Sequence, residues 1–164
     1  MTVDGGTGDV ATLDALRHVE HEVATLMRRA RRAVAERARL VHPDLQGIGY
    51  LLLVQVEQEG PVRGSTLCET LQLDKAAVSR SLHHLTDLGL VEGRPDPDDG
   101  RATLVSVSAE GRRRVRAVDR QRREVLARRF EGWDAADLHG VAQVLHRYNG
   151  TFEEERAVSP ARGA

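Results

Sequence analysis

Two short stretches decide how this sequence is expected to fold. Residues 71–80 read Leu-Gln-Leu-Asp-Lys-Ala-Ala-Val-Ser-Arg, and residues 95–101 read Pro-Asp-Pro-Asp-Asp-Gly-Arg. Asp74 is placed to cap a helix over 75–88, because a short acidic side chain accepts hydrogen bonds from the free N–H groups of a first helical turn. The proline, aspartate and glycine residues of the second stretch are typical of a turn. A capped helix followed by such a turn predicts a helix-turn-helix with a β-hairpin wing.

The segments around these two stretches fit the same interpretation. A short helix is expected over 64–71, before the capped helix. Extended segments over 90–94 and 103–108 flank the polar turn, and Val105 and Val107 alternate with serines at the period of a strand. These two strands are expected to form the hairpin.

The helix over 75–88 has two different faces. At about 100° per residue, Val78, Leu82 and Leu85 fall on one narrow stripe that is suited to packing on a core. The opposite face carries small and polar residues and no large apolar group. Such a face suits insertion into a DNA major groove, and the alternative is an ordinary amphipathic helix with a solvated polar face. The residues of this face are Ala76, Ser79, Arg80 and His83.

Apolar residues at three- and four-residue steps predict four further helices. The first begins after a Thr12 cap and ends before Pro43, and the second follows an Asp44 cap and runs to Glu59. A long helix runs from Ala109 toward residue 131, and a last helix follows an Asp134 cap. The first and last helices each carry an apolar stripe that needs a partner within the chain or across a dimer.

Composition describes a folded chain with balanced charge. Of 164 residues, 40% are hydrophobic and 30% are charged, which excludes a disordered chain. Aromatic residues make up only 3%, which favours a helical core of leucine, valine and alanine. The net charge of −1 does not indicate a strongly basic nucleic-acid binder. However, nine arginines fall within 111–129, so positive charge is concentrated in one part of the chain. Lys75 is the only lysine, and the other basic residues are arginines.

Several classes of protein are not expected. No apolar stretch is long enough to span a membrane, and the N-terminus lacks the features of a secretory signal. Cys68 stands alone, so no disulfide forms within the chain and a cytoplasmic location is expected. His18, His21 and Glu22 lie close together, with His42 further on, but no second cluster completes a metal site. No metal, cofactor or enzymatic activity is expected, since the usual hydrolase, zinc-protease and phosphate-loop motifs are absent.

Five segments together resemble the MarR (multiple antibiotic resistance regulator) family of winged helix-turn-helix transcriptional regulators. The resemblance extends over about 13–152. It rests on Gly-Ser-Thr-Leu at 64–67, residues 71–80, Leu-Thr-Asp-Leu-Gly-Leu-Val-Glu at 85–92, residues 95–101, and Val-Ser-Val-Ser-Ala-Glu-Gly at 105–111.

The resemblance implies a mainly α fold with a small β-hairpin wing, in which N- and C-terminal dimerisation helices flank the winged domain. The partners it implies are a second copy of the chain, a pseudo-palindromic DNA operator and a small-molecule effector, with no membrane. The expected organisation is a disordered tail over 1–10, a helical dimerisation region over 11–42 and 109–155, a DNA-binding domain over 44–108, and a disordered tail over 156–164.

The resemblance also implies a set of DNA-contacting residues. One serine would contact phosphate, five residues of the capped helix would face the major groove, and the wing would contribute a minor-groove element with an arginine at its base. Ser65 is the phosphate contact, and Asp99 and Arg101 form the minor-groove element of the wing, with Arg94 at its base. The five residues of the capped helix are Lys75, Ala76, Ser79, Arg80 and His83. The His83-His84 pair departs from the family's usual basic or polar residues, so base specificity is not transferred.

Family members typically repress transcription, and many release DNA when a phenolic or anionic ligand binds. A ligand pocket lined by Arg17, His18, His21 and Tyr50 is expected on that basis. Two alternatives remain. One is a ligand-binding or protein-interaction dimer with weak or lost DNA binding, and the other is a redox sensor based on Cys68.

Overall fold

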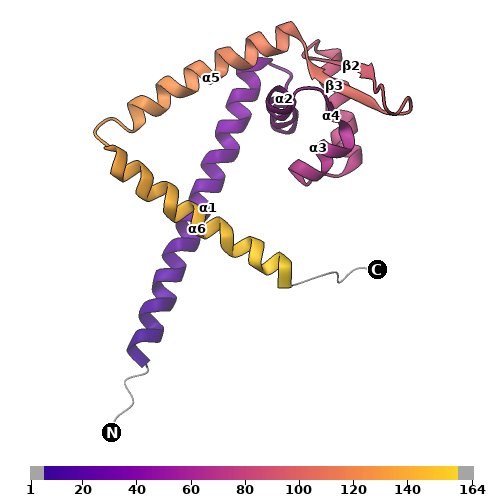
Figure 1. The fold of residues 1–164 in the computed structure, drawn as a ribbon. Coiled ribbons are helices and arrows are strands. Elements are labelled where there is room, and N and C mark those ends of the chain that lie inside the picture. The colour runs from indigo at the N-terminus through magenta and orange to yellow at the C-terminus, as the bar shows by residue number, and fades with distance from the viewer. Residues whose placement is uncertain (1–5, 159–164) are drawn as a thin grey trace. The chain divides into compact units, whose positions relative to one another are not determined.

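The computed structural model describes the backbone of residues 6–158 and the side chains of residues 10–152. The described part is mainly helical with one small antiparallel sheet (Figure 1). Its elements, in chain order, are α1 (Gly6–Val41), α2 (Gly47–Glu59), β1 (Val62–Arg63), α3 (Gly64–Leu71), α4 (Lys75–Asp87), β2 (Val91–Pro95), β3 (Thr103–Val107), α5 (Ala109–Arg129) and α6 (Ala135–Val158).

The chain divides into two compact units, Met1–Arg120 and Gln121–Ala164. The first unit holds α1 to β3 and the first part of α5. The second unit holds the end of α5 and the whole of α6. None of the described helices is long and apolar enough to cross a membrane.

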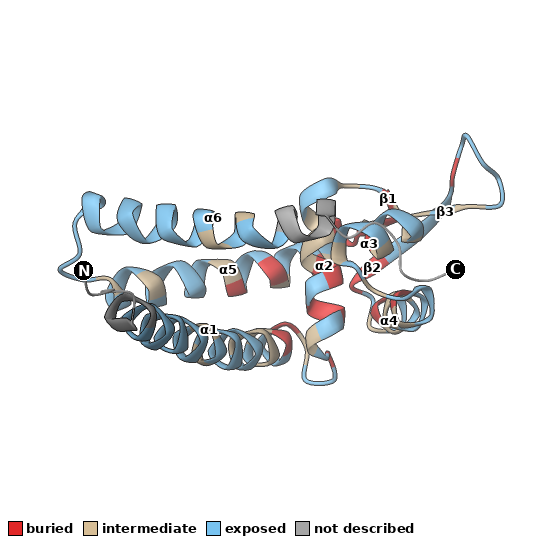
Figure 2. Cartoon of the chain, turned by 90° about the horizontal axis from the view of Figure 1, so that it is seen from below, coloured by how far each residue is buried: buried red, intermediate tan, exposed pale blue. Residues whose placement is uncertain are grey.

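The hydrophobic core belongs to the first unit. Every buried hydrophobic residue of the described chain lies between Ala38 and Val118 (Figure 2). Leu52 and Leu53 of α2 are fully buried at its centre, and the end of α1 and the start of α5 pack onto it. The core therefore extends beyond the 44–108 segment on both sides.

The sheet has the order β1-β3-β2, with both neighbouring pairs antiparallel. The hairpin of β2 and β3 pairs Val91 with Val107 and Pro95 with Thr103, which confirms the predicted wing. Strand β1 was not predicted. Its two residues lie on the other side of β3, where Arg63 is opposite Leu104.

A hydrogen-bonded junction at Ser108 joins the end of α4 to the hairpin and to α5. The Ser108 hydroxyl donates to the carbonyl of Gly89 (2.7 Å) and accepts from the backbone N–H of Gly111 (2.9 Å). The Ser108 N–H donates to the carbonyl of Leu90 (3.0 Å). A Cβ at Gly111 would lie 2.1 Å from this same carbonyl oxygen, so glycine is required for the helix to approach so closely.

Three helix boundaries differ from the sequence predictions. Helix α1 begins at Gly6, so residues 6–10 are helical and Thr12 is not its cap. Asp44 does not cap α2, because the N-cap position is Gln46 and its side chain makes no capping bond. Helix α6 continues to Val158, and residues 1–5 and 159–164 of the expected tails lie outside the described residues.

Other boundaries agree with the predictions. Asp134 and Asp137 cap the start of α6 reciprocally, each side chain accepting from the other's backbone N–H at 2.8 and 3.1 Å. Gly89 follows the end of α4 with φ +66°, a conformation that favours glycine.

The Gly111 contact predicts opposite effects for two equivalent substitutions. Gly111→Ala places a methyl group against the Leu90 carbonyl, and we expect the free energy of unfolding to fall by about 2 kcal/mol. Gly140→Ala in α6 meets nothing within 4 Å, and it should raise that free energy by about 0.5–1 kcal/mol. Urea unfolding followed by circular dichroism measures both, and equal effects of the two variants would contradict the close approach.

Glu110 predicts a pH dependence of stability. Hydrogen bonds from Arg113 and then Arg114 lower its pKa from 4.5 to about 2, and Arg114 also donates to the Val41 carbonyl at the end of α1 (2.9 Å). Because the folded pKa is depressed, this stabilisation is present above about pH 4.5 and is lost as the pH falls through about 2. We expect wild type to exceed Glu110→Gln in unfolding free energy at pH 6 but not at pH 2. A difference that does not change with pH would refute this role.

Candidate nucleic-acid interface

Helix α4 is fixed by its cap and by its apolar face. The Asp74 side chain accepts from the backbone N–H of Ala77 at 2.8 Å, which confirms the predicted cap. Val78 and Leu85 are buried and Leu82 is partly buried against the core. Gln72, with φ 53°, makes the tight turn that joins α3 to α4. The helix-turn-helix predicted from the sequence is therefore present.

The opposite face of α4 is exposed, as the helical wheel predicted. Lys75, Ala76, Ser79, Arg80 and His83 all lie at the surface. Each of the polar side chains carries at least one hydrogen-bond donor, and phosphate oxygens and the edges of guanine and adenine offer acceptors.

An open hollow of about 800 Å³ lies between α3, α4 and the two wing strands. It is lined by backbone and side chains from all four elements. Five of the residues predicted to contact DNA border it together, although they come from three separate parts of the chain. These residues are Ser65, Lys75, Ser79, His83 and Arg101.

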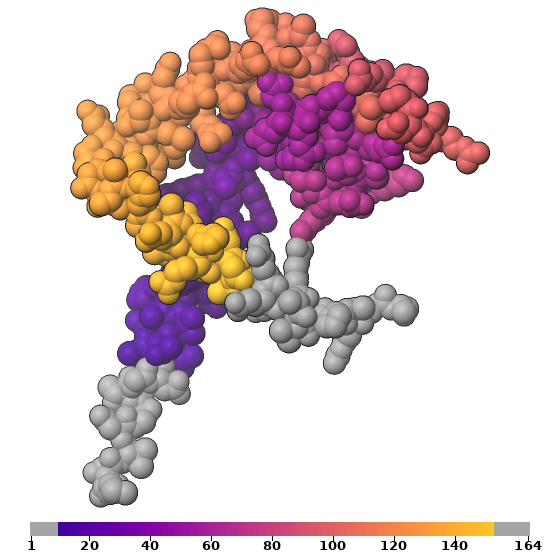
Figure 3. Space-filling view, in the orientation of Figure 1, coloured from indigo at the N-terminus to yellow at the C-terminus, as the bar shows by residue number. Residues whose placement is uncertain are grey.

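The wing loop stands out from the helices of the first unit (Figure 3). Arg94, Asp99 and Arg101 are all exposed on it. The Asp99 carboxylate accepts from the backbone N–H of Arg101 (3.1 Å), and the Asp99 carbonyl accepts from the N–H of Ala102 (2.8 Å). Asp99 thus holds the backbone of the arginine at the tip.

Asp96 is an important wing residue that the sequence reasoning missed. Its side chain is only 3% exposed, and it accepts a hydrogen bond from Nε of Arg63 in an ion pair. This bond and the backbone N–H of Asp98 lower the pKa of Asp96, and the pKa of Arg63 is raised in turn. No signal in the sequence distinguished Asp96 from the exposed aspartates beside it.

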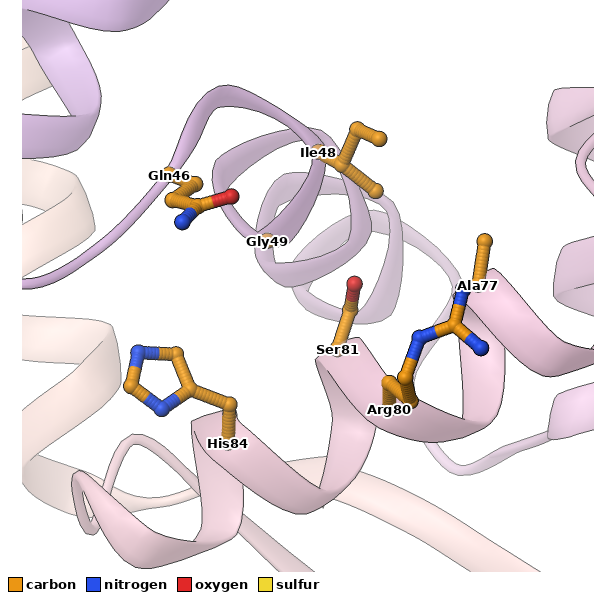
Figure 4. A pocket seen from close by; sticks show the side chains of 7 residues that line it. All are labelled: Gln46, Ile48, Gly49, Ala77, Arg80, Ser81 and His84. Atoms are coloured by element: carbon orange, nitrogen blue, oxygen red, sulfur yellow. The ribbon is translucent and has the colours of Figure 1, made fainter.

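A smaller cavity of about 330 Å³ lies between α4 and the start of α2. Arg80, Ser81 and His84 follow one side of α4 there, opposite Gln46 and Ile48 (Figure 4). Nε2 of His84 lies 3.2 Å from the carbonyl oxygen of Asp44 in the loop before α2.

The two histidines of the unusual His83-His84 pair therefore have different environments. His83 lies on the exposed face of α4, whereas His84 is partly buried and faces α2. Of the two histidines, only His83 lies on the same exposed face of α4 as Ser79.

The residues expected to line a ligand pocket are not brought together within one chain. Arg17, His18 and His21 are exposed on α1, and His18 lies 3.5 Å from Asp14. Tyr50 is buried in α2. Helix α1 packs against the start of α2 through Val34. Val34 is 13 residues beyond His21, or about 20 Å along the helix.

Cys68 and the cluster of His18, His21 and Glu22 are the remaining candidates for a sensing or metal site. Cys68 is a partly buried free thiol that borders the hollow beside α4. Among the residues that the structure describes, no three histidine, cysteine, aspartate or glutamate side chains converge to hold a metal ion.

Comparisons with known proteins identify the same segment. The model of the MarR family matches residues 44–102. The HTH-type transcriptional regulator YxaD of Bacillus subtilis (strain 168) is 28% identical over 134 residues, which cover 82% of this chain and 92% of YxaD. The HTH-type transcriptional regulator MT0903.1 of Mycobacterium tuberculosis (strain CDC 1551 / Oshkosh) is 36% identical over 78 residues, covering 48% and 54% of the two chains.

Solved structures share the fold. The crystal structure of the MarR family transcription regulator SP03579 superposes with a TM-score of 0.76 at 20% identity, covering 91% of this chain and 99% of that one. The mainly helical architecture with a small antiparallel sheet is therefore that of the MarR winged-helix structures.

The cap of α4 generates a direct test of how this helix is held. Asp74→Ala removes the acceptor for the Ala77 N–H, and we expect the free energy of unfolding to fall by about 1 kcal/mol. Asp74→Ser keeps a capping oxygen and should retain most of the stability. Urea unfolding compares wild type with the two variants. An alanine variant as stable as wild type would show that the Asp74 cap does not stabilise α4.

Proposed function

Because this chain is a transcriptional regulator of the MarR family with a DNA-binding helix-turn-helix, we propose that it is a homodimeric repressor acting in the cytoplasm. A small phenolic or anionic ligand would release it from a pseudo-palindromic operator. The observation that carries this proposal is the convergence of Ser65, Lys75, Ser79, His83 and Arg101 on one open hollow.

The exposed face of α4 supports entry into the major groove. Arg80 presents a planar fork that matches the two acceptors of a guanine edge, and Ser79 and His83 are shorter polar contacts one and three positions away. Ala76 offers a methyl group to a thymine methyl. Ser65 and Lys75, at the starts of α3 and α4, suit phosphate oxygens.

The wing supports a second contact in the flanking minor groove. Arg101 lies on a loop that projects from the first unit, and an arginine on such a loop suits the strong negative potential of a narrow minor groove. Arg94 is exposed on the adjacent strand β2. One winged domain would thus contact half of the operator.

Uncovered apolar side chains support a dimer. On α1, Leu13, Leu16 and Leu26 are each more than half exposed, and on α6 Phe152 is also 51% exposed. Apolar stripes of this length rarely stay in water, and a second copy of the chain would cover them. Two-fold symmetry would then place two α4 helices at successive major grooves, about 34 Å apart.

The proposed ligand response is a shift between two dimer arrangements. A ligand that binds better to an arrangement with the wrong spacing of the α4 helices would lower the affinity for the operator. Arg17, His18, His21 and Tyr50 remain the proposed ligand contacts, and the dimer would have to bring them together, since one chain does not. A dimer that binds ligand or protein without binding DNA is the competing function, and DNA binding itself discriminates between the two.

The wing contact predicts a loss of affinity when its arginine is removed. Arg101→Ala should weaken binding about tenfold, because one arginine contact in a groove contributes about 1–3 kcal/mol. Fluorescence anisotropy on a duplex selected by the wild-type protein from a random pool measures the affinity. Binding should also weaken as the salt concentration rises.

Arg32→Ala is the control, since Arg32 is exposed on α1 and its side chain pairs with Glu36 on the same helix. Sedimentation should show an unchanged dimer for both variants. If Arg101→Ala binds as tightly as Arg32→Ala, the wing has no role in recognition. If the wild-type protein selects no DNA, the competing function is favoured.

A further inference from the structure

We propose that Asp96 and Arg63 form a positioning pair that fixes the wing to the start of α3 and so presents Arg101 to the minor groove. The role of Arg101 rests on the function proposed above, whereas the fixing of the wing does not. Asp96 and Arg63 are assigned no direct contact with DNA.

The environment of Asp96 differs from that of every neighbour in the loop. Residue 95 and residues 97–101 are all exposed, yet the Asp96 side chain is 3% exposed. A carboxylate withdrawn from water requires charged or hydrogen-bonding partners. Asp96 has both, since one oxygen accepts from Arg63 and the other accepts from the backbone N–H of Asp98 (2.9 Å).

The ion pair spans the sheet from one edge to the other. Arg63 belongs to β1 and occupies the N-cap position of α3. Asp96 directly follows β2, and β3 lies between these two strands. The backbone hydrogen bonds of the sheet join each edge strand only to β3, so the Arg63–Asp96 pair adds a direct link between the wing base and α3.

A short series of bonds continues from Asp96 to the arginine at the tip. The Asp96 N–H donates to the carbonyl of Ala102 (3.0 Å), and the Ala102 N–H donates to the carbonyl of Asp99 (2.8 Å). The Asp99 carboxylate then accepts from the N–H of Arg101 (3.1 Å). These hydrogen bonds thus connect the backbone of Arg101 to Asp96 at the base of the wing.

The pair also relates two of the proposed DNA contacts. Ser65 is two residues after Arg63, in the first turn of α3, and Arg101 is held through Asp96. Ser65 and Arg101 border the same open hollow. Without the pair, the hairpin is expected to flex about β3, and the distance between the phosphate contact and the minor-groove contact would vary.

Whether Asp96→Asn raises or lowers the affinity for DNA distinguishes a positioning role from a purely electrostatic one. Asp96→Asn removes a negative charge close to the proposed DNA surface, so electrostatics alone would strengthen DNA binding. Loss of the positioning pair would weaken it. Asp98→Asn makes the same charge change at an exposed position two residues away and is the matched control.

The experiment measures affinities for a duplex selected from a random pool by wild-type protein. We expect Asp96→Asn to bind about tenfold more weakly and Asp98→Asn to bind equally or more tightly. In an Arg101→Ala background, Asp96→Asn should cause almost no further loss, because the residue that it positions is already gone. If Asp96→Asn folds poorly, Arg63→Gln, at a side chain that is 42% exposed, takes its place. Because Arg63→Gln removes a positive charge, its lower affinity alone would not separate positioning from charge, so the deciding result is again the absence of further loss in the Arg101→Ala background.

Hydrogen exchange of the wing amides, followed in the free protein, is the second measurement. Residues 98–102 should exchange faster in Asp96→Asn than in Asp98→Asn, while α2 exchanges equally in both. Unchanged exchange in the wing would overturn the positioning pair even if wild type binds no DNA. Equal affinities of Asp96→Asn and Asp98→Asn would overturn the link to Arg101. The same holds if Asp96→Asn lowers the affinity by the same factor in the Arg101→Ala background as in wild type.

Discussion

The close approach of α5 to the end of α4, at the Ser108 junction, is the constraint on which the winged domain depends. Ser108 bonds to Gly89, Leu90 and Gly111 with its hydroxyl and backbone N–H, and only a glycine at 111 leaves room for the Leu90 carbonyl. This junction fixes where the hairpin begins and ends relative to α4. The α4 face and the wing can therefore act as one surface, although turn residues separate them in the sequence.

Local signals in the sequence were sufficient to predict that the helices and the hairpin exist, although the predicted caps at Thr12 and Asp44 were wrong. The caps at Asp74 and Asp134, the apolar stripe of α4 and the alternation in β3 each depend on a few neighbouring residues. Contacts made over a distance were not predictable in this way. Strand β1 has two residues and no period of its own, and the burial of Asp96 depends on Arg63, 33 positions away. The different environments of His83 and His84 follow from the packing of α4 on α2.

Part of the chain's positive charge is taken up in ion pairs. Several arginines are engaged by carboxylates, since Arg63 pairs with Asp96, and Arg112 and Arg116 lie 3.4 and 3.5 Å from Glu57. Arginine thus holds elements together here, and in the proposed function it also contacts DNA. Diffuse attraction to phosphate would be weak, and affinity would depend on a few placed side chains. The winged-helix fold, which the chain shares with a solved MarR-family structure, would supply that placement.

Hydroxyl-radical footprinting of the wild-type protein on its selected duplex tests the DNA-binding surface most directly. If α4 enters the major groove and the wing enters the flanking minor groove, each half-site should show protected sugars beneath the wing. The two half-sites should be centred about one helical turn apart, or a multiple of it. Protection of a single continuous stretch with no symmetric halves, or no protection at low salt, would contradict this surface.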